Sequence, residues 1–159
     1  MKASRVYLET TLFNFYFDED RGFAHASTIK LFDEIAVGNF IAYTSAVVVE
    51  ELMKAPSEKY EKMSNLIQKY GITILAFTEE ADRLADVYVA EGIIPQKFHT
   101  DGLHIALATV NDLDMIISMN FRHIVKRKTI LATGKINNLN GYRAIEIYSP
   151  MEVIEDEND

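Results

Sequence analysis

Short apolar runs alternate along this chain with longer segments in which apolar residues recur every three or four positions. The short runs predict β-strands, and the longer periodic segments predict helices. Several of the short runs are apolar throughout, which is typical of strands that are buried on both faces of a sheet. The predicted strands are "SRVYL" (4–8), "FIAYT" (40–44), "ITIL" (72–75), "DMIIS" (114–118) and, at an edge, "AIEIYS" (144–149).

Residues that cap helices stand at the borders of the periodic segments. A Ser or Thr oxygen accepts a backbone N–H at a helix start, whereas Gly or Pro follows a last turn. The predicted helices start at Ser27, Ser45, about 57, Thr78 and Thr100, and the first four end near Gly38, Pro56, Gly71 and Gly92. The stretch "TGKINNLNGY" (133–142) is rich in turn residues and predicts loops.

Alternating strands and helices predict an α/β protein in which helices cover both faces of a mainly parallel sheet. The length of 159 residues fits one domain, which we place at 1–150. Residues 151–159 form a predicted acidic tail, since the last eight residues, "EVIEDEND", hold five acids.

Four polar residues fall where such a fold builds its sites. Ligands bind outside the carboxyl ends of parallel strands, and the N-termini of the covering helices lie at the same edge. Glu9 follows the first predicted strand and Asn120 follows the fourth. Asp101 opens the helix before that fourth strand, and Glu51 lies six residues beyond Ser45, about 9 Å along its helix. All four are expected to face one crevice.

Three carboxylates and an amide offer only oxygen ligands, and the chain has no cysteine. Such a set suits Mg²⁺ or Mn²⁺, which activates water and stabilises charge in phosphodiester hydrolysis. Each residue also has a local explanation. Asp101 can complement a helix dipole, Asn120 can favour a turn, and Glu9 and Glu51 can be ordinary surface acids.

The net charge of −8 disfavours nonspecific binding to phosphates, but without the five acids of the tail it would be −3. A catalytic encounter with RNA or DNA therefore stays open. No apolar run approaches the ~20 residues that a membrane helix needs, and "MKASRVYLET" lacks the pattern of a signal peptide. We expect a cytoplasmic protein with no membrane partner.

The residues around these acids resemble those of PIN-domain proteins, of the kind found as toxins of VapC-type toxin–antitoxin pairs. "VYLETT" resembles the opening strand of that family with its acid, which is Glu9. "TSAVVVEELMKAP" resembles the second motif, whose acid precedes Leu and maps to Glu51. "DGLHIALATVNDLDMIISMNFRHI" resembles the third motif, with Asp101, its helix and the following strand up to Asn120. The last stretch is the most specific of the three.

The resemblance implies a three-layer α/β/α sandwich and an endoribonuclease that depends on Mg²⁺ or Mn²⁺, with Glu9 and Asp101 as metal ligands. For the toxin branch it also implies homodimers and a cognate antitoxin protein. Two residues depart from the family pattern, because the first acid and the residue after the fourth strand are commonly Asp. Glu9 is one methylene longer, and Asn120 brings an oxygen without a charge, which predicts weaker metal binding and disfavours a second metal.

Two other functions remain open. A catalytically weak or inactive PIN-like scaffold that binds RNA or protein would fit Asn120 and the acidic balance. A phosphotransfer domain would need an Asp nucleophile at the end of the first strand, where Glu9 stands. Near the predicted crevice, Thr10 is a candidate to hydrogen-bond a carboxylate, His104 is expected to be a partly buried structural residue, and "FRHIVKRK" (121–128) offers cations to an RNA backbone.

Overall fold

Five strands form one parallel sheet in the computed structural model, which describes residues 2–155. The strand order is β3-β2-β1-β4-β5, and every neighbouring pair is parallel. Val6 of the central strand pairs with Ala42 on one side and with Met115 on the other. The strands are β1 (Ser4–Leu8), β2 (Phe40–Ser45), β3 (Thr73–Leu75), β4 (Met115–Ile117) and β5 (Glu146–Tyr148).

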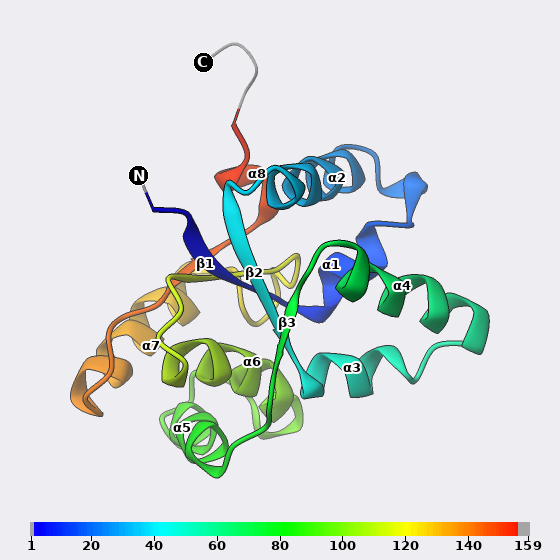
Figure 1. The fold of residues 1–159 in the computed structure, drawn as a ribbon. Helices are drawn as coiled ribbons and strands as arrows, with labels where there is room; N and C mark the ends of the chain where they lie inside the picture. Colours follow the sequence, from blue (N-terminus) through cyan, green and yellow to red (C-terminus); the bar gives the residue numbers. More distant parts are fainter. Residues whose placement is uncertain (1, 156–159) are drawn as a thin grey trace.

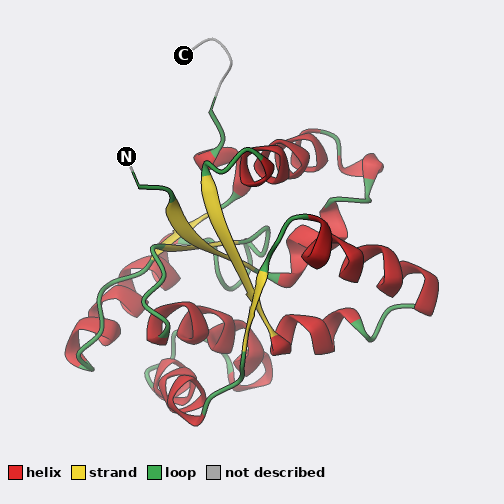
Figure 2. Ribbon diagram, in the orientation of Figure 1, coloured by secondary structure: helices red, strands yellow, loops and turns green. Residues whose placement is uncertain are grey.

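Helices lie on both faces of this sheet (Figures 1 and 2). One face carries α2 (Phe23–Ala36) and α8 (Pro150–Val153), and the other carries α5 (Glu79–Ala90), α6 (His99–Val110) and α7 (Arg127–Leu139). The helices α1 (Thr10–Phe15), α3 (Ala46–Leu52) and α4 (Ser57–Lys69) pack against one another. Two short 3₁₀ turns complete the described chain, η1 (Glu19–Arg21) and η2 (Gln96–Phe98). The expected three-layer α/β/α sandwich is confirmed.

The core runs through the centre of the sheet into α6. Val6, Tyr7 and Leu8 of β1 have no exposed surface, because β2 and β4 flank them and helices cover both faces. Every residue of α6 from 102 to 109 is buried, which explains why this helix is apolar on nearly all sides. The buried α6 therefore brings its first turn, with Asp101, to a fixed place at the edge of the sheet.

Two of the predicted caps are confirmed and two are wrong. The Ser45 hydroxyl accepts the Val48 N–H (3.2 Å), and the Thr78 hydroxyl accepts the Ala81 N–H (3.2 Å). The cap of helix α2 instead lies five residues earlier than predicted, at Gly22 with φ +57°, so Ser27 is buried inside the helix. Helix α6 starts at His99, so Thr100 lies within the first turn.

The largest error of the sequence analysis concerns the stretch 133–142, because residues 133–139 belong to helix α7 (Arg127–Leu139) rather than to loops. The side chains at 129, 133, 136 and 137 are buried, a spacing that forms one helical face. Asn137 on that face donates to the Thr109 hydroxyl (3.2 Å) and accepts from the Tyr88 hydroxyl. These tertiary hydrogen bonds and the burial outweigh the local preference of Gly and Asn for turns.

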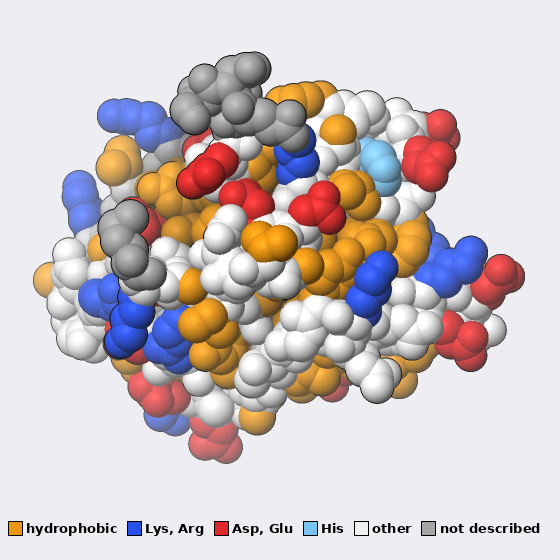
Figure 3. All heavy atoms as spheres, turned by 45° about the horizontal axis from the view of Figure 1, so that its top comes forward, with side chains coloured by type: hydrophobic (Ala, Val, Ile, Leu, Met, Phe, Trp, Pro, Cys, Tyr) orange, Lys and Arg blue, Asp and Glu red, His pale blue; other side chains and the backbone are white. Residues whose placement is uncertain are grey.

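The end of the described chain is helical. Glu152 Oε1 accepts the backbone N–H of Ser149 (3.0 Å) at the start of α8, and α8 packs against α2. The predicted tail at 151–159 thus overlaps α8 in its first three residues, and 156–159 lie outside the described residues. Acidic, basic and apolar side chains are mixed on the face formed by α2 and α8 (Figure 3). Within 2–155, no helix has the length and apolarity that a bilayer crossing requires.

Candidate functional site

The four predicted site residues lie at the carboxyl ends of the strands. Glu9 follows β1 directly and is the N-cap of α1, and Glu51 lies near the end of the short helix α3. Asp101 lies in the first turn of α6, and Asn120 lies three residues beyond β4. Hydrogen bonds connect these positions in two networks, one around Glu51 and one that joins Glu9, Asn120 and Asp101.

Glu9 is buried, with 3% of its surface exposed, and one of its oxygens accepts three hydrogen bonds. Glu9 Oε1 receives the Thr11 hydroxyl (2.6 Å), the Thr11 N–H (3.2 Å) and the Ser118 hydroxyl (2.6 Å). The same two hydroxyls accept the backbone N–H groups of Met119 (2.9 Å) and Asn120 (2.9 Å). This network holds the segment after β4 against the end of β1.

Glu51 is held by a chain of hydrogen bonds that runs through the core. His104 Nε2 donates to Glu51 Oε1 (2.6 Å), and the Thr10 hydroxyl donates to the same oxygen (2.7 Å). On its other side, His104 Nδ1 lies 2.7 Å from the Tyr7 hydroxyl, which lies 2.7 Å from the Ser45 hydroxyl. His104, Tyr7 and Ser45 have no exposed surface. Together His104, Tyr7 and Ser45 are called the core relay below.

One placement of protons satisfies every member of the core relay. Burial raises the pKa of Tyr7 well above its ordinary value, so its hydroxyl keeps its proton and donates to His104 Nδ1. The Ser45 hydroxyl then donates to Tyr7, and His104 donates from Nε2 to Glu51. A protonated His104 would still donate to Glu51, but the Ser45 hydrogen would find no acceptor among the described residues. The bond from His104 to Glu51 is therefore present in both forms.

Asp101 belongs to the second network. Asp101 Oδ2 lies 2.9 Å from His123 Nδ1, and the backbone N–H of His123 donates to Asn120 Oδ1 (3.0 Å). His123 is 7% exposed, and its ring packs against the ring of Phe98 at 4.1 Å between centroids. The side-chain oxygen of Asn120 thus already accepts a hydrogen bond from the protein. This contact fits the local, turn-forming role that the sequence left open for Asn120.

Each carboxylate is held through one oxygen and leaves the other without a protein partner. No hydrogen bond within 2–155 reaches Glu9 Oε2, Glu51 Oε2 or Asp101 Oδ1. None of them is among the described buried side-chain atoms that lack a partner, which are Ser27 Oγ and Glu34 Oε2. Each of the three free oxygens therefore keeps some exposed surface, although Glu9 as a whole is buried.

The pKa values of Glu9 and Glu51 shift in opposite directions, although burial raises both. Burial raises the pKa of Glu9, and the charge of His104 with the hydroxyls of Ser118 and Thr11 offsets only part of that rise. For Glu51, burial raises the pKa, but the hydrogen bond and charge of His104 outweigh it, so the pKa lies below its ordinary value. Burial lowers the pKa of His104, whereas Glu51 and Glu9 raise it to a net increase. A cation near Glu9 would favour its ionised form.

The name crevice is kept below for the edge of the sheet at Glu9, Glu51, Asp101 and Asn120. The donors of these residues suit Mg²⁺ or Mn²⁺ chemically, but the three carboxylates are not spaced as a closed three-ligand set. Within 2–155, three or more candidate ligand atoms lie within 4.8 Å of one another only in the group of Asp82, Asp86 and His99. Mg²⁺ commonly takes one or two carboxylates and completes its shell with water. Two free carboxylate oxygens with water therefore fit the ion better than three would.

The group of Asp82, Asp86 and His99 joins α5 to the start of α6. His99 Nε2 lies 2.8 Å from Asp86 Oδ1 and 3.5 Å from Asp82 Oδ1. Both acid side chains are at least 40% exposed, and the hydrogen bond between His99 and Asp86 accounts for the arrangement without an ion. The group lies at a place that the sequence analysis did not single out.

Sequence reasoning found the four polar residues of the crevice but missed most of their supports. Thr10 does bond a carboxylate, that of Glu51, and His104 is structural and wholly buried. Thr11 and Ser118, which hold Glu9, were not identified. The one local signal that could have identified Ser118 is its position as a hydroxyl residue at the end of an apolar strand.

Comparisons with known proteins support the fold. A search of solved structures found a chain in the "Crystal structure of VapBC2 from Rickettsia felis bound to a DNA fragment from their promoter". The TM-score is 0.60 at 13% sequence identity, and the match covers 91% of this chain and 98% of that chain. No protein-family model and no curated protein matches the sequence. At this identity the likeness concerns the arrangement of helices and strands, which is that of the three-layer sandwich described above.

Proposed function

We propose that this protein is an endoribonuclease that hydrolyses RNA phosphodiester bonds with the help of Mg²⁺ or Mn²⁺. One observation carries the proposal. Glu9, Glu51 and Asp101 lie at the carboxyl edge of a parallel sheet, each is held through one oxygen, and the other oxygen of each has no protein partner within 2–155 and is not fully buried. Clustered acids repel one another in a partly buried crevice, so a cation in the crevice would stabilise the arrangement.

In this proposal Glu9 and Asp101 hold the metal ion through Glu9 Oε2 and Asp101 Oδ1. The bound ion would supply an activated water and stabilise the negative charge that develops on the phosphate. Glu51 Oε2 would accept a hydrogen bond from a water molecule and so orient it, because the core relay and Thr10 fix its other oxygen. Asn120 would orient His123, which in turn orients Asp101.

The same proposal includes a biological setting. One solved structure with a similar fold is a VapBC2 complex, and the sequence motifs around Glu9, Glu51 and Asp101 resemble those of VapC-type toxins. We propose that the chain is the toxin of a toxin–antitoxin pair, that it binds a cognate antitoxin protein, and that it forms a homodimer. An enzyme that acts on cellular RNA in this way would work in the cytoplasm.

Cleavage of a labelled single-stranded RNA tests the proposal. The wild type should cleave in Mn²⁺ and not in EDTA, and Asp101→Asn should abolish cleavage because the ion loses an anionic ligand. Without metal, this variant should be as stable as the wild type or melt higher, since repulsion among the acids is relieved. The lost anion at the start of α6 opposes that gain by roughly 0.3–1 kcal/mol.

A matched control comes from the other acidic group. Asp86→Asn removes the same charge from the cluster with His99, and it should leave cleavage unchanged. A wild type that shows no metal-dependent cleavage, or an Asp101→Asn variant that cleaves normally, contradicts the proposal. An equal loss of cleavage in both variants would show that general charge, rather than the crevice, was being measured.

A noncatalytic scaffold that binds RNA or protein is the second candidate. One observation favours it, because Asn120 Oδ1 already accepts the His123 N–H and its position commonly carries Asp in PIN domains. The cleavage assay separates the two candidates, since a scaffold would bind RNA or a partner without metal-dependent product. A phosphotransfer domain finds less support, because Glu9 rather than Asp follows β1.

A further inference from the structure

The charges of this chain are distributed unevenly in sequence. Residues 115–145 contain six of the sixteen Lys and Arg residues and none of the 24 acids. The rest of the chain therefore carries a net charge of −14. A segment of this kind attracts polyanions locally although the whole protein is acidic. It follows β4 and so begins at the carboxylate crevice.

The fold adds a cation from another segment to this basic stretch. Lys97 of η2 and Arg122 of the loop after β4 both lie over the ring of Phe98, with Lys97 Nζ at 5.8 Å and the Arg122 guanidinium at 5.5 Å from its centroid. Lys126 precedes α7, and Arg127 and Lys128 are its first residues. We call this surface the basic shelf: Lys97, Phe98, Arg122, Lys126, Arg127 and Lys128.

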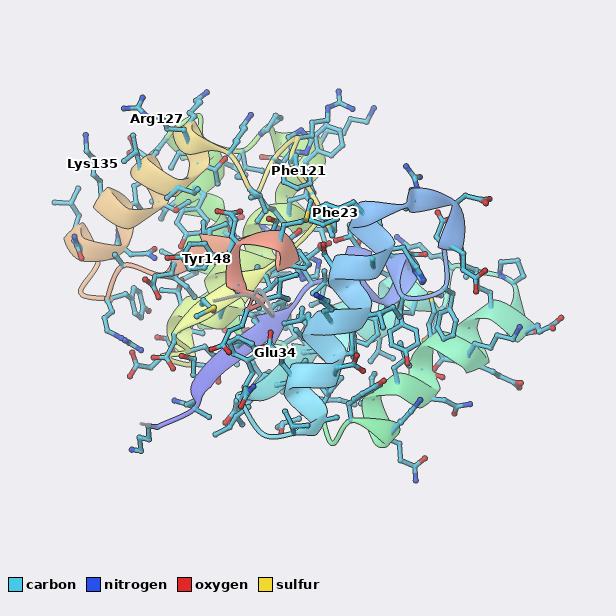
Figure 4. The ribbon with its side chains drawn as sticks, turned by 90° about the horizontal axis from the view of Figure 1, so that it is seen from above. Phe23, Glu34, Phe121, Arg127, Lys135 and Tyr148 are labelled. Carbon is cyan, nitrogen blue, oxygen red and sulfur yellow. The ribbon has the colours of Figure 1, made fainter. Side chains whose placement is uncertain are left out.

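The cations of the basic shelf are not neutralised by the protein. None of the five forms an ion pair with an acid within 2–155. The first turn of α7 carries no acid either, although acids stabilise that end of a helix and cations oppose it. Arg127 points outward from α7 (Figure 4), and Lys97, Arg122 and Lys128 are also exposed. A bound anion would relieve the repulsion among these side chains.

One side chain separates the basic shelf from the carboxylate crevice. The His123 ring packs on Phe98 at 4.1 Å, and its Nδ1 atom lies 2.9 Å from Asp101 Oδ2. A phosphate held by Lys97 and Arg122 over the Phe98 ring would therefore lie next to the site proposed for cleavage. This continuity matters because three carboxylates repel the phosphates of a substrate, and cations beside them offset that repulsion.

We propose that the basic shelf binds the phosphate backbone of single-stranded RNA next to the scissile bond, an inference that rests on the proposed ribonuclease function. Phe121, which is 49% exposed and adjoins Arg122, offers a ring on which a base can stack. Cations that follow the backbone, combined with exposed aromatic rings, are the usual means of binding single strands without sequence preference. An acidic protein segment, as an alternative ligand, would bind the cations of the basic shelf but would gain little from stacking on the aromatic rings.

Binding of a fluorescent oligouridylate in EDTA tests the shelf without cleavage. The double variant Arg122→Gln/Arg127→Gln should bind roughly tenfold more weakly, because two phosphate contacts are lost. The slope of log affinity against log salt should fall by about 1.4, at ~0.7 for each contact to a single strand. Arg122→Lys/Arg127→Lys should keep the slope of the wild type, because it keeps both charges.

A control variant removes the same charge from other surfaces. Lys30 lies on α2 and Lys69 lies in the last turn of α4; both are exposed. Lys30→Gln/Lys69→Gln should change RNA affinity by less than about twofold, since screened charges away from the RNA contribute little. Equal weakening in both double variants, or no weakening in the shelf variant, overturns the proposal. So does a fluorescent oligoglutamate peptide that binds the wild type as tightly as the RNA does.

Cleavage kinetics in Mn²⁺ separate this inference from the proposed function. The shelf double variant should raise KM and leave kcat nearly unchanged, because it weakens RNA binding and leaves the crevice intact. If the shelf double variant cleaves with the KM of the wild type, the basic shelf does not bind the substrate, and the proposed ribonuclease function is unaffected. A wild type that binds RNA through the shelf but never cleaves it would refute the ribonuclease alone.

Discussion

Glu51 and Asp101 are both supported by a histidine, but the two supports differ in depth. His104, which holds Glu51, is wholly buried and is itself held by Tyr7 of β1. His123, which holds Asp101, is 7% exposed and belongs to the segment between β4 and α7. The orientation of Glu51 is therefore set by the packing of the core, whereas that of Asp101 depends on a connecting segment.

The difference has a physical meaning for the proposed site. The bond between Tyr7 and His104 is fully buried, so it acts in a low effective dielectric, and its loss leaves polar groups without water. The bond between His123 and Asp101 is partly buried and is the one hydrogen bond of the His123 ring within 2–155, so water can replace it at little cost. Damage to the core relay should therefore weaken the fold and the site together, whereas damage to the Asp101 support should mainly affect the site.

Removal of each histidine gives the largest contrast. His104→Leu should cost about 3 kcal/mol of unfolding free energy, because Tyr7 and Glu51 lose a buried partner. His123→Leu should cost about 1 kcal/mol, since water can reach Asp101. Urea denaturation in EDTA at neutral pH measures both values. Similar costs for the two variants would show that burial does not distinguish the supports.

A smaller change within the core relay is Tyr7→Phe. It removes one hydroxyl and leaves His104 Nδ1 and the Ser45 hydroxyl without their common partner, at a cost of about 1–2 kcal/mol. Tyr148→Phe is a matched control, because its hydroxyl contacts only the exposed Glu146 (3.2 Å) among the described residues (Figure 4 labels Tyr148). The control should change stability by less than about 0.5 kcal/mol. A harmless Tyr7→Phe would mean that water or Ser45 replaces the lost bond.

On the Asp101 side, Asn120→Asp should tighten Mn²⁺ binding by a modest factor. The new carboxylate keeps an acceptor for the His123 N–H and places a second oxygen where Nδ2 now has no protein partner within 2–155. The added charge attracts the cation. Titration calorimetry on both forms measures the affinity. Unchanged or weaker binding would show that Asn120 lies outside the metal shell.

The smallest effect is a difference in pH dependence between two amide variants in EDTA. The pKa of Glu9 is raised on folding, so its contribution to stability is present below its ordinary pKa and is lost as pH rises through the folded value. Glu9→Gln should therefore stabilise the protein at neutral pH, and the gain should vanish in acid. Glu51 has a lowered pKa, so its contribution is present above its ordinary pKa and is lost as pH falls through the folded value.

Glu51→Gln should accordingly destabilise the protein at neutral pH, with a deficit that shrinks in acid. Melting temperatures of both variants and the wild type over a pH series test the pair. Two curves that move in the same direction would show that the hydrogen bond from His104 does not outweigh the burial of Glu51.

The sequence was sufficient for the parts of the fold that depend on local patterns. Strand positions follow from apolar runs, and the helices after Ser45 and Thr78 follow from caps within three residues of their partners. Helix α7 was missed because Gly134 and three Asn residues favour turns locally, whereas its stability comes from burial against other elements. The start of α2 depends on the positive φ of Gly22, which the sequence does not reveal.

The same distinction between local and long-range interactions applies to the candidate crevice. Its acids could be located because each stands at the end of a predicted element. Their supports could not, because they join residues far apart in sequence. Ser118 bonds Glu9 across 109 positions, and His104 bonds Tyr7 across 97. Only the folded register of β1 against β4 brings such hydroxyls and rings together.

The central place of β1 has a consequence for the timing of synthesis. The partner strand β4 and the hydroxyl of Ser118 are translated more than 100 residues after β1. At about 5–20 residues per second, the 109 positions between Glu9 and Ser118 take a ribosome roughly 5 to 22 s. During that interval Glu9 lacks the strand that holds it, so a nascent chain cannot assemble the crevice. Any activity that the crevice possesses would begin only after β4 and Ser118 have been translated.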